Sequence, residues 1–195
     1  MPSVTYDLGW AWFKDRLLAK VVLAGGRVNT ELLSLVISVK TVQSQVWGTV
    51  KKQADGTIFP ESYLELETYC PSVIVEIVSS ENSSELMVDK QWWLNFAKQS
   101  VHGKLMLLML IDVNAAKRRM VVRFYTTPDL NEDTSRTLDL SLDDPIPDSA
   151  RLVFLPEWLY GAVTPPEWIQ GKSIIMDHED LDQWRRLVRT SLYAT

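Results

Sequence analysis

One carboxylate, Glu76, interrupts an otherwise apolar run of Val and Ile at residues 73–78. Such a run is typical of a strand that is covered on both faces, and strand alternation puts Ile74, Glu76 and Val78 on the same face. Burial of an unpaired carboxylate costs several kcal/mol or forces the group to hold a proton. The sequence therefore predicts that a cation lies beside Glu76.

Two kinds of cation would satisfy this requirement. A structural partner would be a basic side chain on a neighbouring strand, such as Arg123 or Lys104. A functional partner would be a metal ion, held with the help of a second carboxylate. Asp55 is a candidate for that carboxylate, because "QADGTIFP" places it in a turn just before another expected strand. For an isolated acid in an apolar strand, the structural pairing is the commoner case.

The elements that must position these residues follow from the surrounding pattern. A helix is predicted over residues 8–24 and is stopped by a Gly-Gly pair. The strand that carries Glu76 leads into a second helix, which opens on a capping-box pattern and ends at Gly103. A hairpin over residues 104–126, two short strands and a closing helix complete the order. This order predicts an α/β (α+β) fold with a mixed central β-sheet flanked by helices.

Length and composition limit the classes of function. The 195 residues suit a single domain, 1–195, and the eight Trp residues suggest large core side chains. A net charge of −5 argues against a protein that coats nucleic acid non-specifically, since that binding needs many phosphate contacts. No apolar run is long enough for a bilayer, and the N-terminus lacks the pattern of a signal peptide. With a single cysteine, an intracellular location in cytoplasm or nucleus is expected.

A strand bearing an acidic residue, preceded by an Asp and followed by a helix, resembles the core of the PD-(D/E)XK nuclease superfamily. The chain is more closely similar to a restriction-endonuclease-like domain family, in a divergent branch found in filamentous fungi. The matching features are Pro71, the strand "VIVEI", the turn "SSEN", and Asp89 with Trp93 in the next helix. The resemblance extends over about residues 50–190.

This resemblance implies a domain layout. The restriction-endonuclease-like core would span about residues 46–160. A helical N-terminal segment, 8–45, would precede it, and a C-terminal strand and helix, 173–193, would follow it.

The resemblance also implies a metal site. Asp55 and Glu76 would coordinate Mg²⁺ (or Mn²⁺), and the backbone carbonyl of Ile77 would be a further ligand. Asp89 is either a third ligand or an ordinary acid near a helix N-terminus. The implied activity is hydrolysis of phosphodiester bonds in nucleic acid, with DNA favoured over RNA, and many proteins of this fold act as homodimers.

One position departs from the superfamily pattern. The lysine of its Glu-x-Lys motif would fall at Val78, which carries no charge. In similar bacterial proteins the next helix supplies that lysine, and Lys90 is the candidate here. Lys90 is adjacent to Asp89, so the two side chains point about 100° apart on a helix, and a solvated lysine is an equal alternative. Glu81 in the turn is a weaker candidate for the site.

Two other functions stay open at this stage. A catalytically inactive nuclease-fold module would bind a protein or nucleic-acid partner. Such a module should expose an apolar or aromatic patch, and Trp158, Tyr160 and Trp168 are candidates for it. A purely structural domain would pair Glu76 with a buried cation and have no pocket beside it.

Overall fold

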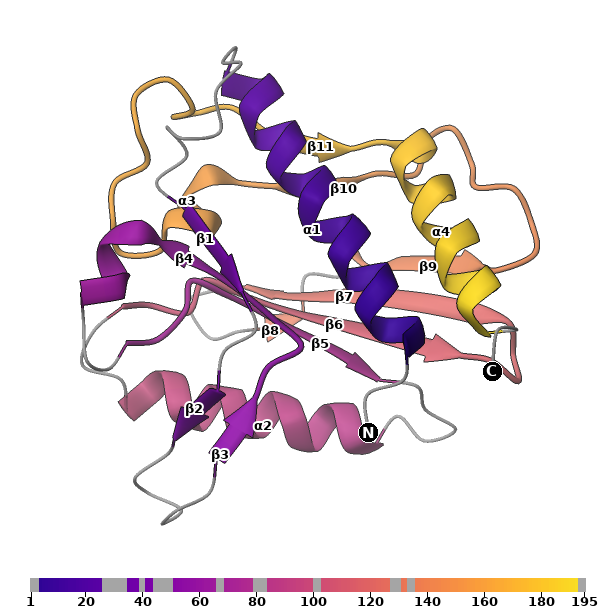
Figure 1. The fold of residues 1–195 in the computed structure, drawn as a ribbon, viewed down its shortest axis with the longest axis horizontal. Helices are drawn as coiled ribbons and strands as arrows, with labels where there is room; N and C mark the ends of the chain where they lie inside the picture. Colours follow the sequence, from indigo (N-terminus) through magenta and orange to yellow (C-terminus); the bar gives the residue numbers. More distant parts are fainter. Residues whose placement is uncertain are drawn as a thin grey trace.

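The structure is a computed structural model, shown in Figure 1. It describes residues 4–25, 35–38, 41–43, 51–65, 69–78, 84–99, 103–126, 131–132 and 136–192.

A mixed β-sheet forms the centre of the molecule. Within the described ranges it has seven strands in the order β1-β4-β5-β6-β7-β8, with β9 also paired to β7. Strands β5 and β6 run parallel, and the other neighbours are antiparallel. This confirms the expected mixed sheet. The strands are β1 (Leu35–Ser38), β4 (Gly56–Pro60), β5 (Val73–Val78), β6 (Leu107–Asn114), β7 (Arg119–Thr126), β8 (Asn131–Glu132) and β9 (Leu138–Ser141).

Helices cover both faces of this sheet, as Figure 1 shows. Helix α2 (Ser84–Gln99) lies on one face, and α1 (Val4–Gly25) and α4 (His178–Leu192) lie together on the other. No helix in the described ranges is long and apolar enough to span a bilayer. The smaller elements are β2 (Thr41–Gln43) with β3 (Lys51–Gln53), β10 (Leu152–Phe154) with β11 (Ile174–Met176), the 3-10 helix η2 (Glu61–Glu65) and α3 (Pro156–Tyr160).

Strand β5 is buried on both faces, as its sequence predicts. Val73 and Val75 belong to the core under α1 and α4, whereas Ile74 belongs to the separate core under α2. Glu76 follows Ile74 on the α2 face, and its exposed fraction is only 4%. The parallel pairing with β6 extends along the whole of β5. An ionisable group therefore lies inside the sheet, beneath a helix.

The N-terminal third differs from the expected helical segment 8–45. The helix ends at Gly25, and Leu35–Ser38 and Thr41–Gln43 are strands. The β-branched residues of these segments favour extended backbone, and β1 gains a complete antiparallel ladder with β4. Strand β3 begins at Lys51, and residues 46–50, at the start of the expected core, lie outside the described ranges.

A buried carboxylate also joins the two helices on the opposite face. Asp180, at the start of α4, has no exposed surface and accepts hydrogen bonds from Arg16 and Lys20 of α1. The Lys20 ammonium lies 2.6 Å from an oxygen of Asp180, and the second partner of that oxygen is the backbone N–H of Asp177, at 3.0 Å. The contact therefore fixes α1 against the first turn of α4.

We expect Asp180→Ala to lower the free energy of unfolding by about 3 kcal/mol, because it leaves two cations without their shared acceptor and opens the first turn of α4. Urea denaturation followed by circular dichroism measures this change. Asp148→Ala is the control, since the Asp148 side chain is 98% exposed and its loss should change stability by less than about 0.5 kcal/mol. Equal stability of the two variants would contradict the assignment.

Candidate functional site

Strand pairing brings Asp55 and Glu76 together. Gly56, the first residue of β4, pairs with Val75 of β5, so Asp55 stands at the strand end beside Glu76. The Asp55 carboxylate accepts a hydrogen bond of 2.7 Å from the backbone N–H of Ile77. This bond fixes the Asp55 carboxylate against β5. The two carboxyl groups also interact directly.

Two side chains contact Glu76 from other elements. The indole N–H of Trp93, a fully buried residue of α2, donates a hydrogen bond to Oε1 of Glu76. The Lys52 ammonium lies 3.3 Å from the same oxygen. Lys52 comes from β3, and Figure 1 places β3 on the α2 side of the sheet. Glu76 therefore meets a cation, which is Lys52 and not one of the two basic residues expected from the sequence.

Helix α2 contacts both members of the ion pair between Lys52 and Glu76. Asp89 accepts a hydrogen bond of 2.6 Å from the Lys52 ammonium, and Trp93 lies four residues further along the helix. Residues four apart lie on the same helix face, so α2 directs one group to Lys52 and the other to Glu76. The Lys52 ammonium also lies 5.9 Å from the centre of the Trp93 ring.

The charges of this cluster do not balance. Asp55, Glu76 and Asp89 supply three carboxyl groups, and in the described part of the chain Lys52 is the basic side chain that contacts them. Burial raises the pKa of Glu76 to about 8, although the Lys52 charge opposes this shift. Burial also raises the pKa of Asp55, against the lowering effect of the Ile77 N–H. The positive charge near these two carboxyl groups is thus too small to offset the effect of burial on their pKa values.

The opposite face of the strand end is tightly packed. A side chain at Gly56 would overlap the ring of Trp10, because a Cβ there would lie 2.1 Å from a ring atom. Trp10 is part of α1 and belongs to the core on that face of the sheet. The backbone beside Asp55 therefore packs closely against α1, and the Asp55 carboxyl group projects from this packed strand end.

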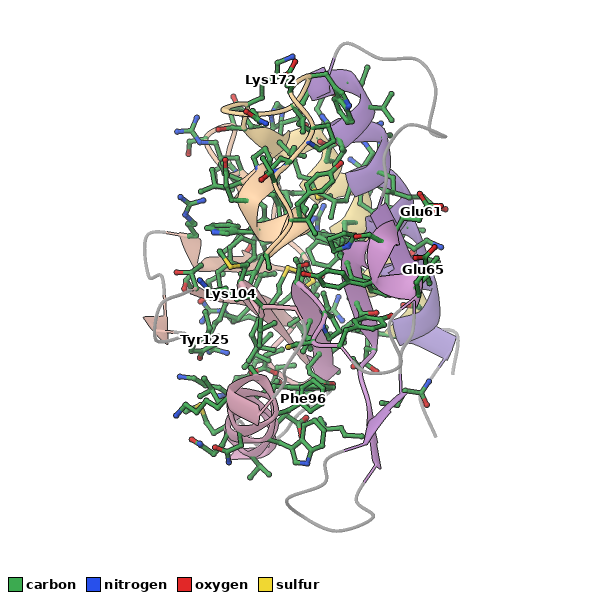
Figure 2. All side chains as sticks on the ribbon, turned by 90° about the vertical axis from the view of Figure 1, so that its left-hand side faces the viewer. Glu61, Glu65, Phe96, Lys104, Tyr125 and Lys172 are labelled. Atoms are coloured by element: carbon green, nitrogen blue, oxygen red, sulfur yellow. The ribbon has the colours of Figure 1, made fainter. Side chains whose placement is uncertain are left out.

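The structure gathers most of the residues that the sequence singled out. Asp55, Glu76 and Asp89 form one cluster, and Ile77 joins it through its backbone N–H. The ammonium of Lys90 lies instead 4.0 Å from the ring centre of Tyr125, on β7. Figure 2 shows α2 end-on with Tyr125 beside it. Glu81 lies outside the described ranges, and the roles of all these residues remain predictions.

Two contributors were missed from the sequence. The sequence pattern did not single out Lys52, although it stands only three residues before Asp55 and could have been linked to the site on that basis. Trp93 is one of the features that match the nuclease pattern, but its hydrogen bond was not predicted, although the N–H of a buried indole needs an acceptor. Asp112 lies inside β6, and its carboxylate lies 4.0 Å from the guanidinium of Arg123.

The donor set suits a hard divalent cation. Magnesium sites in proteins commonly use one or two carboxylates, with water and substrate phosphate as the other ligands. Asp55 and Glu76 supply two such carboxylates with unbalanced charge, and the carbonyl of Ile77 is adjacent in the chain. In the described residues, no three His, Cys, Asp or Glu side chains converge into a ready-made metal centre. The residues therefore fit an open site rather than a closed cage.

No protein-family model and no curated protein matches this chain. Among solved structures, the chain is similar to a crystal structure of a "putative nuclease belonging to DUF820" from Anabaena variabilis ATCC 29413. The TM-score is 0.47 and the sequence identity 13%, over 95% of this chain and 84% of that chain.

The raised pKa of Glu76 makes stability depend on pH. Its ordinary value is 4.5 and its value in the folded protein is about 8. Between these values the folded protein binds more protons than the unfolded chain, so its stability falls as the pH rises. We expect the Glu76→Gln variant not to show this fall. Without divalent metal, its free energy of unfolding should rise by about 2–4 kcal/mol relative to that of the wild type as the pH goes from ~5 to ~8.5.

Urea denaturation at the two pH values measures this gain. Gln keeps an acceptor for the Trp93 indole, so the comparison isolates the charge. The control is Asp139→Asn, which removes a carboxylate from an exposed ion pair with Arg119. It should change the free energy of unfolding by the same amount at both pH values. Parallel pH curves for the wild type and Glu76→Gln would show that burial does not perturb this group.

Proposed function

We propose that this chain is a metal-dependent nuclease that hydrolyses phosphodiester bonds of nucleic acid. The observation that carries the proposal is the pair of adjoining carboxyl groups, Asp55 and Glu76. In the described part of the chain, the one basic side chain that contacts them, Lys52, does not balance their charges. A purely structural cluster is expected to match its buried carboxylates with cations or hydrogen-bond donors. A pair that is short of positive charge is the arrangement expected of a site that binds a further cation.

The residues divide into binding and supporting roles. Asp55 and Glu76, with the backbone carbonyl of Ile77, would hold Mg²⁺ or Mn²⁺. When bound, that ion would activate a water molecule and stabilise negative charge on the phosphate. Trp93 fixes the orientation of the Glu76 carboxyl group, and the Ile77 N–H fixes that of Asp55. Asp89 is already bonded to Lys52, which favours a supporting role over that of a third metal ligand.

The expected substrate is DNA rather than RNA. The negative net charge makes a broad basic surface unsuitable as the main source of affinity, so the substrate would be gripped locally at the site. Action as a homodimer remains part of this proposal.

A second candidate is a nuclease fold without catalysis that binds a protein or nucleic-acid partner. The ion pair between Lys52 and Glu76 favours it, because that contact already satisfies part of the buried charge. The aromatic patch expected of such a module is not exposed, however. Trp158 and Tyr160 are buried, and of the three residues only Trp168 is partly exposed. The exposed apolar side chains include Met87 and Val88 on α2.

Metal binding and cleavage together test the nuclease. Calorimetric titration with Mn²⁺ should give binding to the wild type, and both Asp55→Asn and Glu76→Gln should weaken it at least about tenfold, since each removes one anionic ligand. The same proteins are then incubated with plasmid DNA and with single-stranded RNA. Only the wild type should cleave, and DNA should be cleaved faster.

Asp139→Asn is the matched control, because it removes an exposed carboxylate far from Glu76 in the strand order and should change neither binding nor cleavage. If the wild type takes up no Mn²⁺ and cleaves neither substrate, the nuclease proposal is rejected in favour of the binding module.

A further inference from the structure

Strand β5 carries no basic residue at the position where the proposed nuclease needs a positive charge. This inference rests on the proposed nuclease, in which a positive side chain should lie near the phosphate to offset its developing charge. Val78, two residues after Glu76, is apolar and packs into the core under α2. Strand β5 therefore supplies no such charge.

Lys90 does not fill this gap in the structure. Its ammonium lies over Tyr125 of β7, and two strand spacings separate β7 from β5. Neighbouring strands are about 4.8 Å apart, so that ring stands roughly 10 Å from the strand of Glu76. A contact with the Tyr125 ring also holds the ammonium in this direction, since cations are attracted to the ring face.

Lys52 lies where the charge is needed. Its ammonium is 3.3 Å from Glu76 and 2.6 Å from Asp89. A lysine ammonium has three hydrogens, and these two contacts use two of them. Its side chain is 21% exposed, so the group is held by its partners and still reaches solvent. Within the described residues, one donor therefore remains for an oxygen atom of a substrate.

We propose that Lys52 of β3 is the catalytic lysine of this site, donating to a phosphate oxygen in place of the lysine missing at Val78. Asp89 is a positioning residue, since it acts on the substrate only through Lys52. The charge thus enters the site from β3, a strand outside the main sheet, and not from the strand of Glu76 or from α2.

The Lys52 ammonium lies between two carboxylates, 3.3 Å from Glu76 and 2.6 Å from Asp89, and both attract its positive charge. A lysine ammonium held in this way is suited to stabilising negative charge on phosphate. Lys52 would therefore assist by charge and hydrogen bonding.

Cleavage kinetics provide the first test. We expect Lys52→Ala to lower kcat for plasmid DNA by about 10²-fold or more, the effect of removing one donor to a developing negative charge. Lys52→Arg should recover part of this loss, and Asp89→Asn should give an intermediate rate. Lys90→Ala should stay near the wild type. A large loss in Lys90→Ala with an active Lys52→Ala would overturn the assignment.

Binding measurements separate this role from that of the metal ligands. In Mn²⁺ titrations, Lys52→Ala should bind the ion at least as tightly as the wild type, because a like charge has been removed from the ligands. A loss of Mn²⁺ affinity in Lys52→Ala would mean that Lys52 only maintains the site, and would reject its catalytic role. Melting temperatures identify any variant that fails to fold, in which case Lys52→Gln, which also removes the charge, replaces Lys52→Ala in the comparison.

Affinity for DNA tests the contact without turnover. A short fluorescent DNA duplex is titrated with each protein in Ca²⁺, and Lys52→Ala should bind about tenfold more weakly, with a salt dependence reduced by about one phosphate contact. Lys98→Ala, an exposed lysine in the last turn of α2, is the control. Equal binding by Lys52→Ala and the wild type refutes the contact, whereas absence of cleavage by the wild type refutes only the nuclease.

Discussion

The burial of Glu76 in β5 is the constraint on which the rest of the structure depends. A carboxyl group with 4% exposure needs donors and positive charge from elements that close over it. Trp93 supplies a donor from above the strand, Lys52 supplies charge from β3, and Asp55 occupies the neighbouring strand end. Because burial still dominates the pKa of Glu76, these contacts offset the desolvation only in part. The remaining deficit is what makes the cluster a candidate site.

The layers on the two faces of the sheet differ in how their buried charges are balanced. Under α1 and α4 the core is largely apolar, and the fully buried carboxylate there, Asp180, is matched by two cations. Under α2 a smaller core surrounds a cluster that, among the described residues, has more carboxyl groups than cations. A fold can tolerate such a cluster when the opposite layer contributes most of the apolar burial that stabilises the sheet. The well-packed layer and the layer of the site are thus separated by one sheet.

Local pattern was sufficient for much of this arrangement. The unbroken apolar run predicted a central strand, and alternation correctly assigned Glu76 to the same face as Ile74. The hairpin of β6 and β7 could also be predicted, because its contacts are close in sequence. Lys52 could not be assigned in this way, since its contact with Asp89 joins residues 37 apart and depends on how β3 meets α2. The direction of the Lys90 side chain likewise depends on the Tyr125 ring of β7, and the periodicity of α2 alone does not predict that contact.

The spacing of Asp89 and Trp93 has a consequence for how this sequence can diverge. Both residues reach the cluster from one face of α2 because four residues separate them. Single substitutions in the exposed parts of this helix leave that alignment unchanged. Insertion or deletion of one residue between the two positions would rotate one contact by about 100° relative to the other. Descendants of this chain should therefore accept many replacements in α2, but conserve the length of the interval from Asp89 to Trp93.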